Sequence, residues 1–387
     1  MSMAAEPSKP APGAPVGGWL ERLRSWPQRR IADPAFRRWA QRHWLTRPIA
    51  RRQAKALFDL VAGFVYSQVL LACVQLQLFD RLAAGPASLE DLAQGLRLPP
   101  ERARRLLDAA VALRLLTSPA PGRYALGTLG AAMVGNHEVA AMVKHHPALY
   151  ADLRDPVALL RGESANTALA EFWPYASAGG GSATASVAAY SALMTASQPL
   201  VGEQLLDAYP LEQHRCLLDV GGGEGAFLIA AGQRHPRLQL RLFDLPAVAE
   251  RAHRRFAAFG MASRAQCIPG DFFCDALPAG ADVVSLVRVV HDHDDDRVHR
   301  LLCATHAALP PGGTLLLAEP MAATPQAPAM GDAYFGWYLL AMGSGRARSA
   351  AELTALLHRA GFTDVRQRPT RMPLQTSLLT ARRPGKP

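Results

Sequence analysis

The spacing of hydrophobic residues changes along the chain and separates it into regions of different secondary structure. The longest apolar stretch runs from Ala56 to Phe79, but five Asp, Ser and Gln residues interrupt it. A helix that spans a membrane needs about twenty largely uninterrupted apolar residues. The pattern therefore predicts a long helix that packs against another helix across a dimer interface, and no transmembrane segment.

Short segments with recognisable helix starts follow this long helix. Ser88 stands three residues before Asp91, ahead of leucines at helical spacing, which is typical of a capped helix start. Pro99 and Pro100 begin the next amphipathic segment, and residues 122–130 predict a short strand that ends a hairpin. Helices followed by a hairpin form a winged-helix layout.

A winged helix leaves two functions open. Many DNA-binding regulators use this layout, and Arg102, Arg104 and Arg105 on a recognition helix would suit the phosphate backbone. The same module also serves as a dimerisation platform in enzymes, and a fold alone does not decide the function.

From Cys216 the pattern changes to alternating strands and helices. An apolar run of strand length leads into a glycine-rich turn and then a helix, which is how a doubly wound α/β sheet begins. Gly221, Gly223 and Ala226 fit the dinucleotide-binding pattern, and Asp244 ends the next strand, where an acid binds ribose hydroxyls. A nicotinamide cofactor is therefore one interpretation.

Three features favour S-adenosylmethionine instead. Asp219 precedes the glycines, where an acid helps to hold a cationic amino-acid group. Asp271, followed by Phe272, stands where a third strand should end, a position suited to the adenine amino group. The chain also ends in two strands joined by a hairpin, and such late antiparallel strands are typical of class I methyltransferases.

Between Ala54 and Arg382 the chain resembles the plant-type O-methyltransferases. The resemblance is carried by motifs in the order and spacing of that family: LLDVGGGEGAF, FDLP, PGDFF, VRVVHDHDDD, LLLAEP and LLHRAGF. It implies a homodimer with S-adenosylmethionine as cofactor, and an α/β, Rossmann-like methyltransferase domain preceded by a mostly helical winged-helix dimerisation domain.

Other stretches are similar to one bacterial branch of this family, and they include LRDPVALLRG, FWPYASAG and YSALMTASQ. The enzymes of this branch, of the demethylspheroidene and hydroxyneurosporene O-methyltransferase type, methylate tertiary hydroxyls of acyclic carotenoids in purple phototrophic bacteria. The similarity implies a hydrophobic carotenoid as the acceptor.

The stretch VVHDHDDD, residues 289–296, admits a metal site, a catalytic base or an acidic helix cap. The resemblance implies that His291 is the general base and that Glu319 orients it. Asp294, Asp295 and Asp296 then cap and charge the next helix, where negative groups are favourable. His293 is predicted to lie on the surface, and no metal is predicted.

Further site residues follow from the resemblance. Met194 matches a methionine near the transferred methyl group, and Trp337 and Met342 are candidates for the wall of the acceptor pocket. Arg288 is a candidate for cofactor contact, or else simply finishes its strand. The family's second acid is absent, because the segment GRARS has Ala347 at that place.

The chain carries a net charge of +10, and +9 of it lies between Trp19 and Lys55 among tryptophans. Such a segment suits an anionic membrane surface. Packing on a partner subunit and binding nucleic acid are the alternatives. Five scattered cysteines without a C-x-x-C pair indicate reduced thiols and a cytoplasmic protein, peripheral to the membrane at most.

The sequence thus predicts five regions. They are a disordered leader (1–18), the basic segment (19–55), a winged-helix dimerisation domain (56–160), a connector contributing to the acceptor pocket (161–214) and the cofactor-binding domain (215–387). Carotenoid O-methylation is the predicted function. A methyltransferase for a soluble phenol or polyketide and a DNA-binding regulator that senses a ligand are the alternatives.

Overall fold

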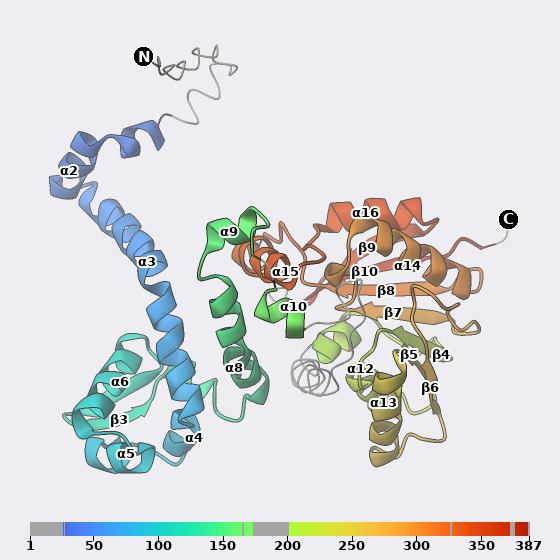
Figure 1. The fold of residues 1–387 in the computed structure, drawn as a ribbon, viewed down its shortest axis with the longest axis horizontal. Coiled ribbons are helices and arrows are strands. Elements are labelled where there is room, and N and C mark those ends of the chain that lie inside the picture. The colour runs from blue at the N-terminus through green and yellow to red at the C-terminus, as the bar shows by residue number, and fades with distance from the viewer. Residues whose placement is uncertain are drawn as a thin grey trace, which may run out of the picture.

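The computed structural model describes residues 26, 28–164, 166–172, 201–325, 327–371 and 376–385. Figure 1 shows a helical N-terminal part, a C-terminal part built on a sheet, and helices α8 to α10 between them. The predicted leader 1–18, Trp19 and Met194 lie outside the described residues.

The long apolar stretch forms α3 (Arg47–Gln75), which follows α2 (Pro34–Arg42) and leads into α4 (Leu78–Leu82). The helix therefore begins earlier than its apolar pattern. It ends where Gln77 takes a left-handed conformation with φ of 54°. Only Leu71, Cys73 and Val74, near its C-terminal end, are buried in this chain.

By length and composition alone, α3 meets the requirement for a helix that could span a membrane. One such helix is weak support for a membrane span, because apolar helices of other proteins meet the same requirement. Figure 1 shows α2 and the first half of α3 extending away from the rest of the chain. Apolar residues of this half are exposed: Leu57, Phe58, Leu60, Val61 and Phe64.

The winged-helix layout is confirmed. Ser88 is the N-cap of α5 (Leu89–Leu96), and its hydroxyl accepts the Asp91 N–H at 3.1 Å. Helix α6 (Pro100–Ala112) is followed by the strands β2 (Leu116–Ala120) and β3 (Arg123–Leu126). Together with β1 (Ala87–Ser88), which precedes α5, they form a three-stranded antiparallel sheet in the order β1-β3-β2.

Among the described residues, several helices lie between the winged helix and the sheet of the second domain. They are α7 (Thr128–Ala131), α8 (His137–Asp152), α9 (Pro156–Leu160), α10 (Ala168–Phe172) and a helical segment at residues 201–208. Helix α8 contacts α3 on one side and α15 (Gly336–Met342) on the other, so it touches both parts of the chain.

The second domain contains a seven-stranded sheet in the order β6-β5-β4-β7-β8-β10-β9. Five strands are parallel, and β10 lies between β8 and β9 and is antiparallel to both. The predicted terminal hairpin is therefore present. The strands are β4 (Cys216–Val220), β5 (Gln239–Asp244), β6 (Ala265–Pro269), β7 (Val283–Val287), β8 (Thr314–Glu319), β9 (Thr363–Arg368) and β10 (Ser377–Arg382).

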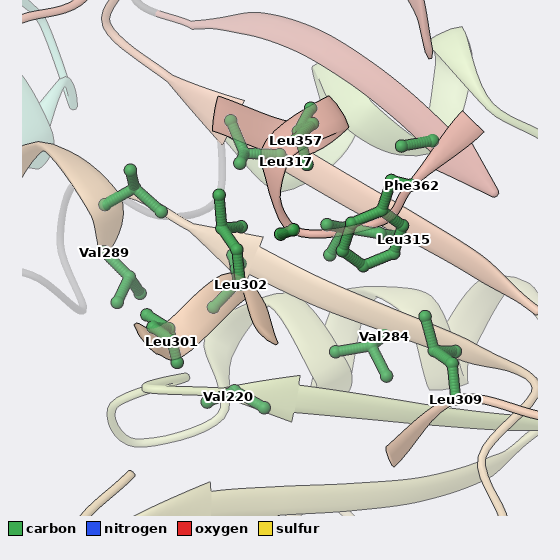
Figure 2. Packing of buried hydrophobic residues seen from close by; sticks show 14 of the residues in the cluster. Val220, Val284, Val289, Leu301, Leu302, Leu309, Leu315, Leu317, Leu357 and Phe362 are labelled. Atoms are coloured by element: carbon green, nitrogen blue, oxygen red, sulfur yellow. The ribbon is translucent and has the colours of Figure 1, made fainter. Parts of the chain in front are cut away.

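Helices cover both faces of this sheet, which is why β4, β7 and β8 are buried along their whole length. On one face, strand residues such as Val284 and Leu317 pack against Leu302 and Leu357 (Figure 2). These two come from α14 (Asp295–Ala308) and α16 (Ala350–Arg359). The other face packs on α12 (Ala226–Arg234) and α13 (Pro246–Ala258).

Because the parallel strands share one direction, their carboxyl ends meet at a single edge of the sheet. The predicted site residues follow these ends: the glycine turn after β4, Asp244 at the end of β5, a 3-10 turn (Val290–Asp292) after β7, and Glu319 at the end of β8.

Candidate active site

The glycine turn after β4 is shaped by close contacts with buried acids. Gly223 has φ of +61°, and its N–H donates to Asp244 Oδ2 at 2.8 Å. A Cβ on Gly222 would lie 2.3 Å from Asp219 Oδ2. The turn therefore needs glycine both for its backbone conformation and for the space that Asp219 occupies.

Asp219 carries the clearest sign of a ligand in this turn. The side chain is buried, and its Oδ1 accepts a hydrogen bond from the Ser285 hydroxyl at 2.6 Å. Its Oδ2 is buried without a hydrogen-bond partner. Burial raises the pKa of Asp219 to about 7, although the bond from Ser285 opposes this shift. A cationic group placed beside Oδ2 would give that oxygen a hydrogen-bond partner and would lower the pKa of Asp219.

Asp244 is fixed by two backbone donors, the N–H groups of Gly223 and Leu245. Burial raises its pKa to about 6, while these hydrogen bonds lower it. Asp271 accepts the Phe273 N–H at 2.8 Å and so closes the turn after β6. This turn brings Phe272 beside Gly221, where an added Cβ would lie 3.5 Å from the Phe272 ring.

His291 and Glu319 come together as predicted. His291 Nδ1 lies 2.5 Å from Glu319 Oε2, and both side chains are buried. Glu319 Oε1 accepts the N–H groups of Val289 and Val290 at 3.0 and 2.6 Å. The carboxylate thus holds the imidazole and the backbone that carries it. With Nδ1–H donated to Glu319, His291 Nε2 is the nitrogen left to act as a base.

Asp292 is a residue that the sequence reasoning did not single out. Its Oδ1 lies 3.1 Å from His291 Nε2, so the imidazole lies between two carboxylates. Burial alone would lower the pKa of His291, but the charges of Asp292 and Glu319 raise it above its ordinary value. Burial raises the pKa of Asp292 as well. Its position directly after His291 was the feature of the sequence that could have indicated this contact.

The prediction for His293 is wrong. This side chain is 4% exposed, and its ring lies edge-on to Phe272 and Phe273. Burial lowers its pKa to about 3, so His293 is neutral at ordinary pH. The physical reason is that His293 packs against Phe272 and Phe273, which follow β6, and these rings shield it from solvent.

The three following aspartates lie at the start of α14, as predicted. Asp294 is the N-cap residue, and Asp295 and Asp296 occupy the first turn. The Asp294 side chain makes no capping hydrogen bond to the helix. Among the described residues, no group of three or more His, Cys, Asp or Glu side chains is arranged to hold a metal ion.

Aromatic side chains of residues 334–338 lie beside the imidazole, and we call them the aromatic wall. The Phe335 ring centroid lies 6.1 Å from that of His291, and Tyr334 packs edge-on against Phe335. His146 Nε2 lies 2.8 Å from Tyr334 Oη, and the corresponding distance from His145 to Tyr338 is also 2.8 Å. These two pairs join α8 to the second domain, and sequence spacing does not reveal them.

The remaining pocket candidates lie near this wall. Met342 is fully buried in a cluster with residues of α8, α9 and α10, and Trp337 is partly buried against that cluster. Arg288 follows β7 with φ of +58°. Burial raises the pKa of Tyr334 to about 12, and the positive charge of Arg288 opposes this rise as it opposes the raised pKa of His291. Arg288 therefore lies close to the base and to the aromatic wall.

Family comparison identifies the kind of protein. The O-methyltransferase domain model matches residues 150–363, and the O-methyltransferase dimerisation domain model matches residues 58–136. The chain belongs to the O-methyltransferase family. Its dimerisation domain supports a homodimer, while the finer division into basic segment, winged helix, connector and cofactor-binding domain stays a prediction.

Two named relatives of this O-methyltransferase are similar over most of their length. The chain is 46% identical to demethylspheroidene O-methyltransferase of Cereibacter sphaeroides, covering 89% of this chain and 91% of the relative. It is 43% identical to the enzyme of the same name from Rhodobacter capsulatus, covering 87% and 84%. The solved structure of human N-acetylserotonin methyltransferase in complex with SAM superimposes with a TM-score of 0.72 at 25% identity, covering 86% and 98%.

The raised pKa of Asp219 generates a prediction for the ligand-free protein. Its pKa is about 7 in the folded protein and about 3.9 when unfolded. The folded state therefore binds the extra proton between these values, and this contribution to stability is lost as the pH rises from about 4 to about 7. We expect Asp219→Asn, which cannot ionise, to lose less stability than the wild type over this range.

The measurement is the urea midpoint of ligand-free wild type and Asp219→Asn at pH 5.5 and pH 8. The variant should be the more stable protein at pH 8, and its advantage should shrink at pH 5.5. An advantage of equal size at both pH values would contradict the raised pKa.

Proposed function

We propose that this protein transfers a methyl group from S-adenosylmethionine to the tertiary hydroxyl of an acyclic carotenoid of the demethylspheroidene type. The observation that carries the proposal is the 43–46% identity, over most of the chain, to two enzymes named for that acceptor. The apolar and aromatic residues beside His291 support it, because such an acceptor has only one polar group to orient.

The residues at the glycine turn suit this cofactor. The buried and unpartnered Asp219 Oδ2 would accept from the cationic amino group, and Asp244 would accept from the ribose hydroxyls. We assign Gly221 and Gly223 to the close approach of the ligand to the backbone. Asp271, Phe272 and Arg288 complete the proposed cofactor set, with Asp271 and Phe272 at the adenine.

When bound, S-adenosylmethionine supplies an electrophilic methyl group on a sulfonium centre. In the proposed reaction, His291 Nε2 would accept the proton of the acceptor hydroxyl as its oxygen bonds to the methyl carbon. The bond between that carbon and sulfur would break, and its electron pair would stay on the sulfur, which leaves as a neutral thioether. Glu319 keeps Nδ1 protonated and aims Nε2 at the acceptor. Asp292, 3.1 Å from Nε2, stabilises the imidazolium that results.

Positioning is expected to contribute more than proton removal. A tertiary alcohol holds its proton strongly, and a positioned base typically contributes about 10²–10⁴-fold. Alignment of the reacting atoms can contribute roughly 7–11 kcal/mol. We assign Trp337 and Met342 to the region that aligns the acceptor, and Met194, which lies outside the described residues, to the vicinity of the methyl group.

The acceptor class is tested with labelled S-adenosylmethionine and two acceptor preparations in detergent. One contains demethylspheroidene, and the other is a mixture of soluble phenols. We expect label in the carotenoid alone. Label only in the phenols would keep methyl transfer and overturn the carotenoid assignment. Label in neither, with duplex DNA bound in a salt-dependent manner, would favour the regulator.

His291→Ala tests the base. We expect kcat to fall by about 10²–10⁴-fold, while the affinity for S-adenosylmethionine in isothermal titration stays near that of the wild type. His253→Ala, which removes an exposed histidine of α13, is the matched control and should retain activity. Equal losses of turnover and cofactor affinity in His291→Ala would instead make His291 a structural residue.

We further propose that the protein is cytoplasmic and contacts an anionic membrane through the part of residues 19–55 that the structure describes. Trp44 is 73% exposed, and Trp26, Trp39 and Ile49 are exposed as well. Arginines at positions 37, 38, 42, 47, 51 and 52 lie on α2 and α3. Exposed tryptophans beside clustered arginines suit the headgroup region of a membrane. A membrane-dissolved acceptor would give this contact a purpose.

The membrane contact is tested in the full-length protein with Trp39→Ala/Trp44→Ala. We expect the double variant to co-sediment less than the wild type with vesicles that contain about 30% anionic lipid. The control is Leu129→Ala/Leu160→Ala, which removes two exposed leucines outside the basic segment. Unchanged co-sedimentation of the tryptophan variant would refute the contact. Wild-type binding should also weaken as the salt concentration rises.

A further inference from the structure

The backbone that carries His291 is held from two opposite sides. On one side, Glu319 accepts the N–H groups of Val289 and Val290. On the other, the carbonyl oxygens of four successive residues, Val290 to His293, all accept hydrogen bonds from the segment Ser344–Arg348. We call this segment the clamp. It contains Ala347, the position at which the family resemblance leads one to expect a second acid.

Each of the four carbonyls has its own donor in the clamp. The Arg348 guanidinium donates Nη1–H to the Val290 carbonyl at 3.0 Å and Nη2–H to the His293 carbonyl at 2.7 Å. The Arg346 backbone N–H donates to the His291 carbonyl at 2.9 Å. The Ser344 hydroxyl donates to the Asp292 carbonyl at 2.9 Å.

Gly345 allows the clamp to approach this closely. Its φ is +77°, and an added Cβ would lie 2.1 Å from the His291 carbonyl oxygen and 2.5 Å from the Asp292 carbonyl carbon. Any side chain at this position would therefore displace either the clamp or the turn that carries the imidazole.

Arg348 is the only clamp side chain that reaches both ends of the turn among the described contacts. It is 2% exposed, and it also forms an ion pair with Asp295 at 2.7 Å. The guanidinium thereby ties together the start of the turn, its end and the first turn of α14. The planar fork of donors explains why arginine rather than lysine suits this place.

We propose that Arg348 is a positioning residue for methyl transfer. With Ser344 and Gly345 it fixes the backbone of Val290–His293, so that His291 Nε2 points at the acceptor while Nδ1 stays on Glu319. This inference rests on the proposed role of His291 as the base. The segment acts on the backbone carbonyls of the turn, although Ala347 stands where the resemblance implies an acid.

Loosening the clamp should change the surroundings of the imidazole. The charged or titratable groups that act on His291 or lie beside it are Glu319 on β8, Asp292 and His293 on its own turn, and Arg288 after β7. The two carboxylates raise the pKa of His291, and Arg288 lowers it. If the turn drifts away from Glu319, the pKa of His291 should fall. The acidic limb of the kcat profile should then move to lower pH.

The experiment compares four full-length proteins with labelled S-adenosylmethionine and demethylspheroidene. Arg348→Met removes the buried guanidinium, and Ser344→Ala removes a single donor with little risk to folding. Arg366→Ala is the matched control, because it removes an exposed arginine of β9 that pairs with the exposed Asp364 and lies outside the clamp. The fourth protein is the wild type.

We expect kcat to fall by about 10- to 100-fold in Arg348→Met and a few-fold in Ser344→Ala, since a displacement of about 1 Å can cost 10²-fold. The KM for S-adenosylmethionine should change by less than about threefold in both. The acidic limb should shift to lower pH in the same two variants, and Arg366→Ala should match the wild type in kcat and limb position.

A second measurement does not depend on turnover. Histidine labelled with ¹³C reports the titration of the His291 imidazole by NMR, with His291→Ala used to assign the signal. A lower His291 pKa in Ser344→Ala but not in Arg366→Ala supports the clamp even where the acceptor is wrong. An unchanged His291 pKa in Ser344→Ala, with full activity, overturns the clamp and leaves the proposed function standing. Full activity of His291→Ala would overturn the base, and the clamp with it.

Discussion

The buried carboxylate of Glu319 is the interaction on which the site depends. It ends β8 and receives three hydrogen bonds from the turn after β7, two from backbone N–H groups and one from the His291 imidazole. A carboxylate buried to this degree is stable only when its oxygens are satisfied, and these donors satisfy them. These contacts fix the turn so that Nδ1 of the imidazole faces Glu319 and Nε2 lies beside Asp292.

The acidic groups at this edge of the sheet differ in how many hydrogen-bond donors their oxygens have. Glu319 has its donors within the protein, and Asp244 has two backbone donors. Asp219 has one donor and one buried oxygen without a partner, which leaves its pKa about 7. Incomplete compensation of this kind is characteristic of a place that a ligand completes. The sheet makes the arrangement possible, since helices on both faces exclude water from the strands and leave only their ends open.

In the N-terminal part, by contrast, apolar side chains remain exposed to solvent. Helix α3 leaves Leu57, Leu60 and Phe64 exposed, while tryptophans and arginines surround its start. The part of α3 from residue 58 onward lies within the match to the dimerisation domain, residues 58–136. The basic stretch before it lies outside that match. One continuous helix thus joins the basic stretch to the dimerisation domain.

The sequence alone predicted the two domains, the winged helix and the glycine turn, while the family resemblance implied the pairing of His291 with Glu319. These features depend on local patterns: the period of apolar residues, capping residues such as Ser88, and short motifs of fixed spacing. It also located Asp219 and Asp244, because residues at the ends of parallel strands converge wherever the chain forms this sheet.

Only the tertiary structure decided what surrounds those residues. The contact of Asp292 with Nε2, the burial of His293 and the bond between His145 and Tyr338, 193 residues apart, depend on packing between distant segments. The clamp shows the reason most clearly. Its donors act on backbone carbonyls, which every residue carries, so the sequence contains no pattern that marks which carbonyl Arg348 will reach.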